Sequence, residues 1–274
     1  MKKYVIYVAL LAVFSGRAQD FQGIATYESK TQMGEFEAEG GNITPEIAAM
    51  VKEQLSKSFE KKYTLRFNKT ASIYDEEKQL SNGGGGGMDM QINFAGGGKQ
   101  YKNLKDKVFI TETEIYDKEF LIKDSLSKLE WKLENETKKI GNYTCYKATI
   151  KIDKKPDTPD EDGKAAKAIN ILGATNKDII ITAWYTPEIP VSQGPGEYWG
   201  LPGLILEVND GSTSVLCSKI VLNPKEKIEI TVPKKGKKVT QTEFAKILEE
   251  KTNDMMKMEE GGSDDNKMII KIGG

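Results

Sequence analysis

The sequence of 274 residues contains no histidine. A Ser-His-Asp or Cys-His nucleophile, a histidine general base near neutral pH, and histidine-bearing zinc or non-haem iron sites are therefore excluded. Ser-x-x-Lys patterns occur at 58–61 and 125–128, but without the Ser-Asp-Asn and Lys-Thr-Gly elements of acyl-transfer enzymes. Paired carboxylates remain as the alternative chemistry for an enzyme. We therefore expect no enzymatic activity, no catalytic residue and no cofactor.

The chain also lacks an apolar run long enough to cross a membrane. The longest, Tyr4 to Phe14, has about eleven residues, whereas a spanning helix needs roughly 20. It follows Lys2 and Lys3 and precedes the small residues Gly16 and Ala18. This pattern predicts a secretory signal peptide at residues 1–18, cleaved after Ala18. No cysteine lies near the predicted cut, so we expect an exported protein, 19–274, that is not a lipoprotein.

Cysteine is scarce, and Cys145 and Cys217 are the only two. An oxidising compartment permits a disulfide between them, but the sequence gives no distance. Two separate buried thiols are the other interpretation, and both stay open. A Cys-x-x-Cys redox centre is absent.

Metal sites are predicted to be absent. The acidic stretch 157–162 lacks the twelve-residue spacing of a calcium loop, and a solvated turn explains it better. Thioethers for Cu(I) are offered by Met88, Met90, Met255, Met256 and Met258, but Met255 and Met258 have the spacing of a helix core. Forty basic residues face 41 acidic ones without a basic stripe, which excludes nucleic acid as a partner.

Short runs of alternating apolar and polar residues dominate the remainder and predict strands. They lie at 23–29, 63–67, 71–74, 107–114, 118–122, 131–133, 143–152, 178–185, 204–208, 214–222 and 228–232. No parallel β-α-β alternation is visible, so we expect one mainly β (α+β) domain with a curved, largely antiparallel sheet. Helices at 45–59, capped by Thr44, and at 242–258, opening with Thr242, are predicted to cover it.

Three segments read as mobile loops: the glycine-rich 81–99, the acidic 154–164 and the C-terminal tail. Asp210-Gly211 predicts a two-residue hairpin turn, with Leu206 opposite Val215 and Leu204 opposite Cys217.

The stretch 183–210, AWYTPEIPVSQGPGEYWGLPGLILEVND, has no lysine or arginine. Pro187 and Pro190 end the preceding strand, since neither can donate to a strand ladder. Glycines then permit bends and close backbone approach. We interpret the stretch as a rigid crossover between neighbouring strands, packed on the sheet or against a partner.

Gly200 to Ile205 spell GLPGLI, and the chain resembles the GLPGLI family of exported Gram-negative proteins. Further blocks that resemble the family, in the same order, are SIYDE at 72–76, YTCYKAT at 143–149, AWYTPEIP at 183–190 and GP at 194–195. The resemblance implies a periplasmic or envelope location without an established activity, and genes often near TonB-dependent receptors. The strand pattern also resembles the open half-barrel of LolA-type lipoprotein carriers, an analogy of fold alone.

The leading hypothesis is non-enzymatic binding of an apolar or peptide-like ligand, or of an outer-membrane receptor. Envelope enzyme chemistry by carboxylates and a purely structural adaptor are the alternatives. The residues expected to contact the ligand or partner are Tyr185, Trp199, Leu201, Leu204 and Leu206. Those expected to set the shape of the segment are Pro187, Pro190, Gly200, Pro202 and Gly203. The competing interpretation is that all ten simply build the core.

Overall fold

A computed structural model describes residues 21–31, 35–39, 46, 50, 60–77, 98–115, 118–152, 179–260 and 269–273. Twelve strands form one sheet, and a separate pair, β2 (Glu35–Glu39) and β14 (Ile269–Gly273), forms another. The twelve are β1 (Gln22–Thr31), β3 (Lys61–Asn68), β4 (Ala71–Glu76), β5 (Lys99–Asn103), β6 (Val108–Ile115), β7 (Lys118–Ser125), β8 (Lys132–Ile140), β9 (Tyr143–Ile152), β10 (Ile179–Thr186), β11 (Leu204–Asn209), β12 (Thr213–Leu222) and β13 (Lys237–Val239).

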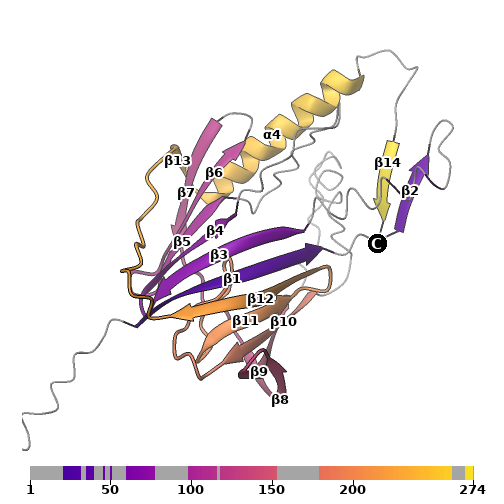
Figure 1. The fold of residues 1–274 in the computed structure, drawn as a ribbon. Helices are drawn as coiled ribbons and strands as arrows, with labels where there is room; N and C mark the ends of the chain where they lie inside the picture. The colour runs from indigo at the N-terminus through magenta and orange to yellow at the C-terminus, as the bar shows by residue number, and fades with distance from the viewer. Residues whose placement is uncertain are drawn as a thin grey trace, which may run out of the picture.

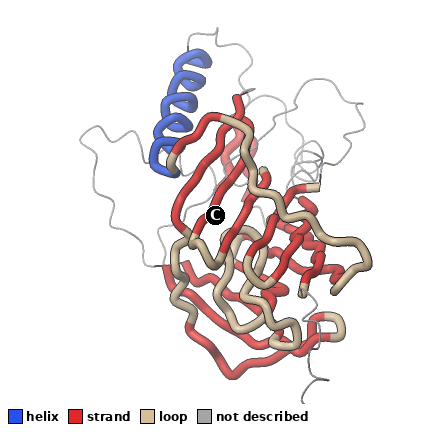
Figure 2. Tube along the Cα trace, turned by 90° about the vertical axis from the view of Figure 1, so that its left-hand side faces the viewer, coloured by secondary structure: helices blue, strands red, loops and turns tan. Residues whose placement is uncertain are grey.

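The order across the large sheet is β13-β7-β6-β5-β4-β3-β1-β12-β11-β10-β9-β8. Pairing is antiparallel throughout, except that β13 runs parallel to β7. The sheet stays open, with β13 and β8 at its two edges, and it bends along its length as a half-barrel does (Figures 1 and 2). The expectation of a mainly β fold with one open antiparallel sheet is confirmed.

One long helix, α4 (Gln241–Glu260), lies at the β7 end of the sheet, away from β8 to β10 (Figure 1). Its first turn is closed by a capping box: the Glu243 amide donates to Thr240 Oγ1 (3.2 Å), and the Thr240 amide donates to Glu243 Oε2 (2.7 Å). The helix therefore begins at Gln241, one residue before the predicted start at Thr242. Phe244 packs edge-on against Phe120, with ring centroids 5.4 Å apart, so the helix covers only this end.

Only Glu46 and Met50 of the predicted helix at 45–59 are described, and both are helical. Met50 is 70% exposed. The rest of that helix, the glycine-rich residues 81–97, the acidic 154–164 and the tail at 261–268 lie outside the described residues. Lys99, assigned to the first of these loops, instead begins β5.

The hairpin between β11 and β12 forms where it was predicted, but its register was wrong by two residues. Val208 faces Val215, and Glu207 faces Leu216. The carboxylate of Asp210 accepts bonds from the amides of Ser212 and Thr213, at 2.9 and 2.7 Å, which places it at the first corner of the turn. A shift of two keeps every side chain on its predicted face.

The predicted strand at 228–232 is instead an extended segment without a backbone ladder. The Ile228 amide donates to Gln22 Oε1 (3.1 Å), and Ile230 packs on the cluster that contains Ile73, Tyr101 and Ile110. We refer to residues 224–231 as the strap, because they cross the sheet and are held to it at both ends.

The main core lies over β1, β3 and β4. Tyr27 is fully buried there and donates its hydroxyl to the Ile205 carbonyl (2.7 Å), while its ring meets Tyr74 edge-on at 6.1 Å. Ile189 and Val191, which follow β10, belong to the same cluster. The core therefore joins the first strands to the segment between β10 and β11.

Candidate functional site

The crossover segment, residues 187–203, links β10 to the adjacent antiparallel strand β11. Pro187 and Pro190 are exposed, whereas Ile189 is buried. The amide of Leu204 donates to the Ile189 carbonyl (3.0 Å), and that of Ile205 to the Gln193 carbonyl (3.0 Å). The first half of the segment thus lies beside the start of β11.

Two glycines are required by this path. A Cβ on Gly203 would lie 2.1 Å from the carbonyl oxygen of Thr186, so the end of β10 and the start of β11 approach more closely than any side chain allows. Gly200 has a φ of 96°, a left-handed conformation that L residues rarely adopt. Pro202, between them, is exposed. The glycines set the shape of the segment at these points.

Polar bonds fasten the crossover segment to two strands far away in the sequence. Ser72 Oγ on β4 donates to Gln193 Oε1 (2.9 Å), and both residues are fully buried. Lys102 Nζ on β5 donates to the carbonyls of Gly194 (2.7 Å) and Tyr198 (2.9 Å). Ser72 and Lys102 are cross-strand partners, so these bonds form one contact area on one face, which we call the inner face.

Lys102 is the most unusual of these groups, because its side chain is only 1% exposed. Burial lowers its pKa to about 7, against the opposing attraction of Glu197. Sequence reasoning missed this residue: β5 reads KQYKN, four polar residues in five, which carries no strand signal.

Tryptophan side chains fasten the second half of the segment. Trp199 Nε1 donates to the Ser127 carbonyl (2.9 Å), and Trp131 Nε1 donates to the Trp199 carbonyl (2.8 Å). The ammonium of Lys107 lies 4.4 Å from the centroid of the Trp199 ring. Both the indole N–H and the ring of Trp199 therefore have partners within the protein.

The residues expected to contact a ligand are all internal. Their exposed fractions are 8% or less, and all of them except Trp199 belong to one of two core clusters. Leu204 and Leu206 join the cluster around Tyr27, whereas Tyr185 and Leu201 join a second cluster under β9 to β11. Their side chains contact the core of the protein rather than solvent, which fits the competing interpretation.

Cys145 and Cys217 are both buried free thiols in the cluster around Tyr27. Burial is the main reason why the pKa of Cys145 rises to about 11 and that of Cys217 to about 12. Neither thiol is activated for nucleophilic chemistry.

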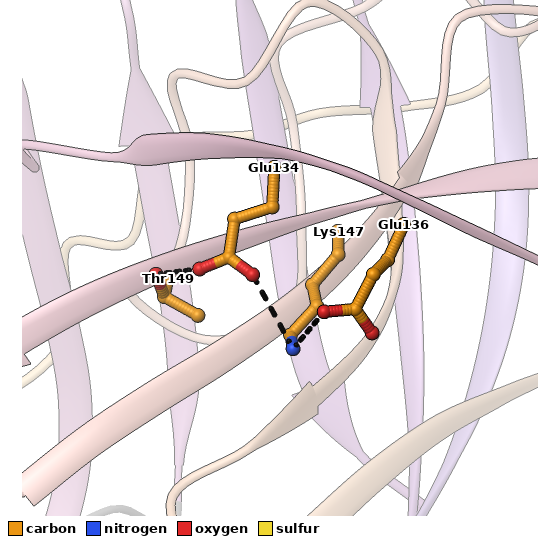
Figure 3. Close-up of polar contacts among 4 residues, drawn as sticks. All are labelled: Glu134, Glu136, Lys147 and Thr149. Carbon is orange, nitrogen blue, oxygen red and sulfur yellow. Dashed lines mark hydrogen bonds and ion pairs between the residues drawn. The ribbon is translucent and has the colours of Figure 1, made fainter.

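A polar network on β8 and β9 is internally paired (Figure 3). Lys147 Nζ lies 3.3 Å from Glu134 Oε2 and 2.8 Å from Glu136 Oε1, and Thr149 Oγ1 donates to Glu134 Oε1 (2.8 Å). The bond from Thr149 is the main cause of the lowered pKa of Glu134. Among the described residues, no group of three or more acidic or cysteine side chains is placed to hold a metal ion.

A cleft of about 530 Å³ opens on the other face of the sheet, between β1, β3, β4 and the strap. Neighbouring strand residues point to opposite faces, so Ile73 of the cleft faces away from Ser72 and the crossover segment. We call this the outer face. Isoleucines at 24, 73 and 228 line the cleft together with charges of both signs. The charged residues are Arg66, Asp75, Lys99, Glu226, Lys227 and Glu229.

Fold and site together define a mainly β protein with an internally fastened crossover on one face of an open sheet and a charged cleft on the other. No described helix is both long and apolar enough to cross a membrane. A family model described as a protein of unknown function (Porph_ging) matches residues 131–207, from the start of β8 into β11.

Two solved structures of PNGF-II, in different crystal forms, are similar to this chain at 15% identity, with TM-scores of 0.49 and 0.48. They cover 83% and 82% of this chain, which spans about a third of theirs (32% and 33%). No curated protein matches the chain.

Proposed function

We propose that the protein is an exported, non-enzymatic binding protein, and that the outer-face cleft holds a peptide-like ligand. The observation that supports this most is the lining of the cleft, where isoleucines alternate with charges of both signs. A peptide offers apolar side chains together with ammonium and carboxylate groups, so it complements such a surface better than a purely apolar molecule does. The volume of about 530 Å³ falls within the range of small-ligand sites.

An apolar ligand on the inner face is supported less well. Leu201, Leu204 and Leu206, the side chains that would contact it, are each 1% exposed or less. The crossover segment occupies the inner face over β4 and β5 through Ser72 and Lys102. A receptor partner of the outer membrane would instead have to contact exposed surface, and the strap is a candidate for that contact.

Two acids of the stretch 183–210 have structural partners, which favours a non-enzymatic role. Glu188 accepts the Thr144 amide (2.8 Å), and Glu207 pairs with Lys138 (2.6 Å). Lys102 has a lowered pKa, but it is enclosed beneath the crossover segment and both of its bonds go to backbone carbonyls. A catalytic lysine has to reach its substrate.

The last residue of the strap, Thr231, and the residue that follows it, Val232, provide a matched test. Thr231 lines the cleft and is exposed, whereas Val232 is exposed but does not line it. Native mass spectrometry of the protein mixed with short random-sequence peptides should detect bound peptide. Thr231→Trp should remove most of that signal by filling the cleft, and Val232→Trp should keep it. Equal binding by both variants, or no binding by the wild type, would reject the proposal.

Export has a separate test, because it depends on the pattern at residues 1–18 rather than on the cleft. We expect the protein from an osmotic-shock fraction to begin at Gln19. A chain that keeps residues 1–18 in the cytoplasmic fraction would contradict export.

A further inference from the structure

Arginine is rare in this protein, and its position is informative. Of the 40 basic residues only Arg17 and Arg66 are arginines, and Arg17 lies within the predicted signal peptide. Arg66 is half-buried on β3 and lines the outer-face cleft. A fold that otherwise uses lysine for surface charge therefore has its single mature arginine in the candidate site.

The neighbours of Arg66 in the sheet are apolar. Its cross-strand partners are Ile24 on β1 and Ile73 on β4, and Ile73 is in turn opposite Tyr101 on β5. Directly opposed side chains lie on the same face about 5 Å apart, so the aliphatic part of the Arg66 side chain runs between two isoleucines. The isoleucines of this row offer no group that can pair with the charge of Arg66.

No described side chain supplies that pairing, since none forms an ion pair or hydrogen bond with the Arg66 guanidinium. Asp75 also lines the cleft, but its register partner is Thr64, which puts it in the next row of the sheet. A long side chain can reach across such a diagonal, yet no ion pair joins Asp75 to Arg66 among the described residues. The planar fork of an arginine matches a carboxylate through two parallel bonds, which a lysine cannot reproduce.

We propose that Arg66 binds a carboxylate of the peptide-like ligand, with the isoleucines on either side limiting the access of water to the pair. This inference rests on the proposed function of the cleft. The acids around it, Asp75, Glu226 and Glu229, are then available for cationic groups of the same ligand. Neutralising the charge of the ligand carboxylate should therefore weaken binding more than changing its apolar side chains.

Three peptide pools identify the group that Arg66 holds. The first contains no Asp or Glu and has free carboxyl ends, the second is the same pool with amidated ends, and the third is amidated but contains Asp and Glu. Binding is measured by native mass spectrometry and by equilibrium dialysis, with inorganic phosphate as a competitor.

We expect the first or the third pool to bind at least about tenfold better than the second, according to whether a chain end or an acidic side chain is held. Arg66→Met should weaken that binding by about 10- to 100-fold, and Arg66→Lys by less, because the point charge survives. Lys62→Met is the matched control: it removes one charge from an exposed position of the same strand outside the cleft, and it should bind normally.

The outcomes separate the two proposals. Equal binding of all three pools, unchanged in Arg66→Met but lost in Thr231→Trp, would overturn the carboxylate inference and leave the binding function standing. Phosphate that displaces the peptides at equal concentration would also overturn it, since the site would then hold anions in general. If no pool binds the wild type, both proposals fail.

Discussion

Replacing Lys102 by methionine tests how the crossover segment is held to the sheet. The substitution keeps the long apolar stem but removes the ammonium that donates to the carbonyls of Gly194 and Tyr198. It also removes a titrating group whose pKa burial lowers from 10.5 to about 7. These two changes have different dependences on pH, so they can be measured separately.

The magnitude follows from proton linkage. Between about pH 7 and pH 10.5 the unfolded chain keeps the Lys102 proton and the folded chain releases it, so the unfolded state binds more protons. The free energy of unfolding therefore rises with pH in this window and falls again as the pH drops towards 7. Integrating the difference of one bound proton between the two states gives a gain of about 2 kcal/mol in the free energy of unfolding from pH 7 to pH 9.

Urea denaturation of the wild type and of Lys102→Met, each at both pH values, isolates this contribution. Every other titrating group, including the two thiols, is present in both proteins and cancels in the difference. We expect the wild type to gain about 2 kcal/mol more than the variant from pH 7 to pH 9. The same pH response in both proteins would refute the burial of an ionisable Lys102 beneath the crossover segment.

Three further results are expected. Gly203→Ala should lower the free energy of unfolding by about 3 kcal/mol, because the added Cβ would collide with backbone. The control Pro202→Ala, at the exposed neighbour, should lower it by less than about 1 kcal/mol. Comparable losses in the two variants would contradict the close approach. Iodoacetamide near neutral pH should leave Cys145 and Cys217 unmodified in the folded protein and modify both after unfolding, as mass spectrometry can show; no reaction after unfolding would indicate a disulfide. Arg66→Met should not lower stability in urea, and a loss above about 1 kcal/mol would show that it supports the fold.

The sequence predicted the sheet well where residues alternate clearly. Strands β1, β3, β4, β6, β7 and β9 to β12 lie where period-two patterns predicted them. The crossover was also predictable, because proline restricts the backbone at Pro187 and Pro190 and glycine permits a close approach at Gly203. The prediction failed where a contact distant in the sequence sets the structure. Residues 228–232 have the composition of a strand, but the Ile228 amide bonds to a side chain of β1 instead of to a neighbouring strand.

The candidate site was harder to predict than the fold. An apolar stretch without cations suggested an exposed contact surface, yet burial in a core produces the same composition, and only the fold distinguishes the two. Lys102 could not be found, because one lysine among 40 basic residues gives no sign that it is buried. Arg66 lines the same cleft as the strap only because of the register of β1, β3 and β4, which the sequence does not specify.

Hydrogen exchange of the full chain, with and without the peptide pool that binds best, tests most directly where the ligand is held. Amides of the strap, residues 224–231, and of the strand rows beneath it should exchange more slowly when peptide is bound. Amides of the crossover segment, residues 187–203, should be unchanged, because that segment is already fastened to the inner face. Protection that appears at 187–203 and not at 224–231 would contradict the assignment of binding to the outer-face cleft.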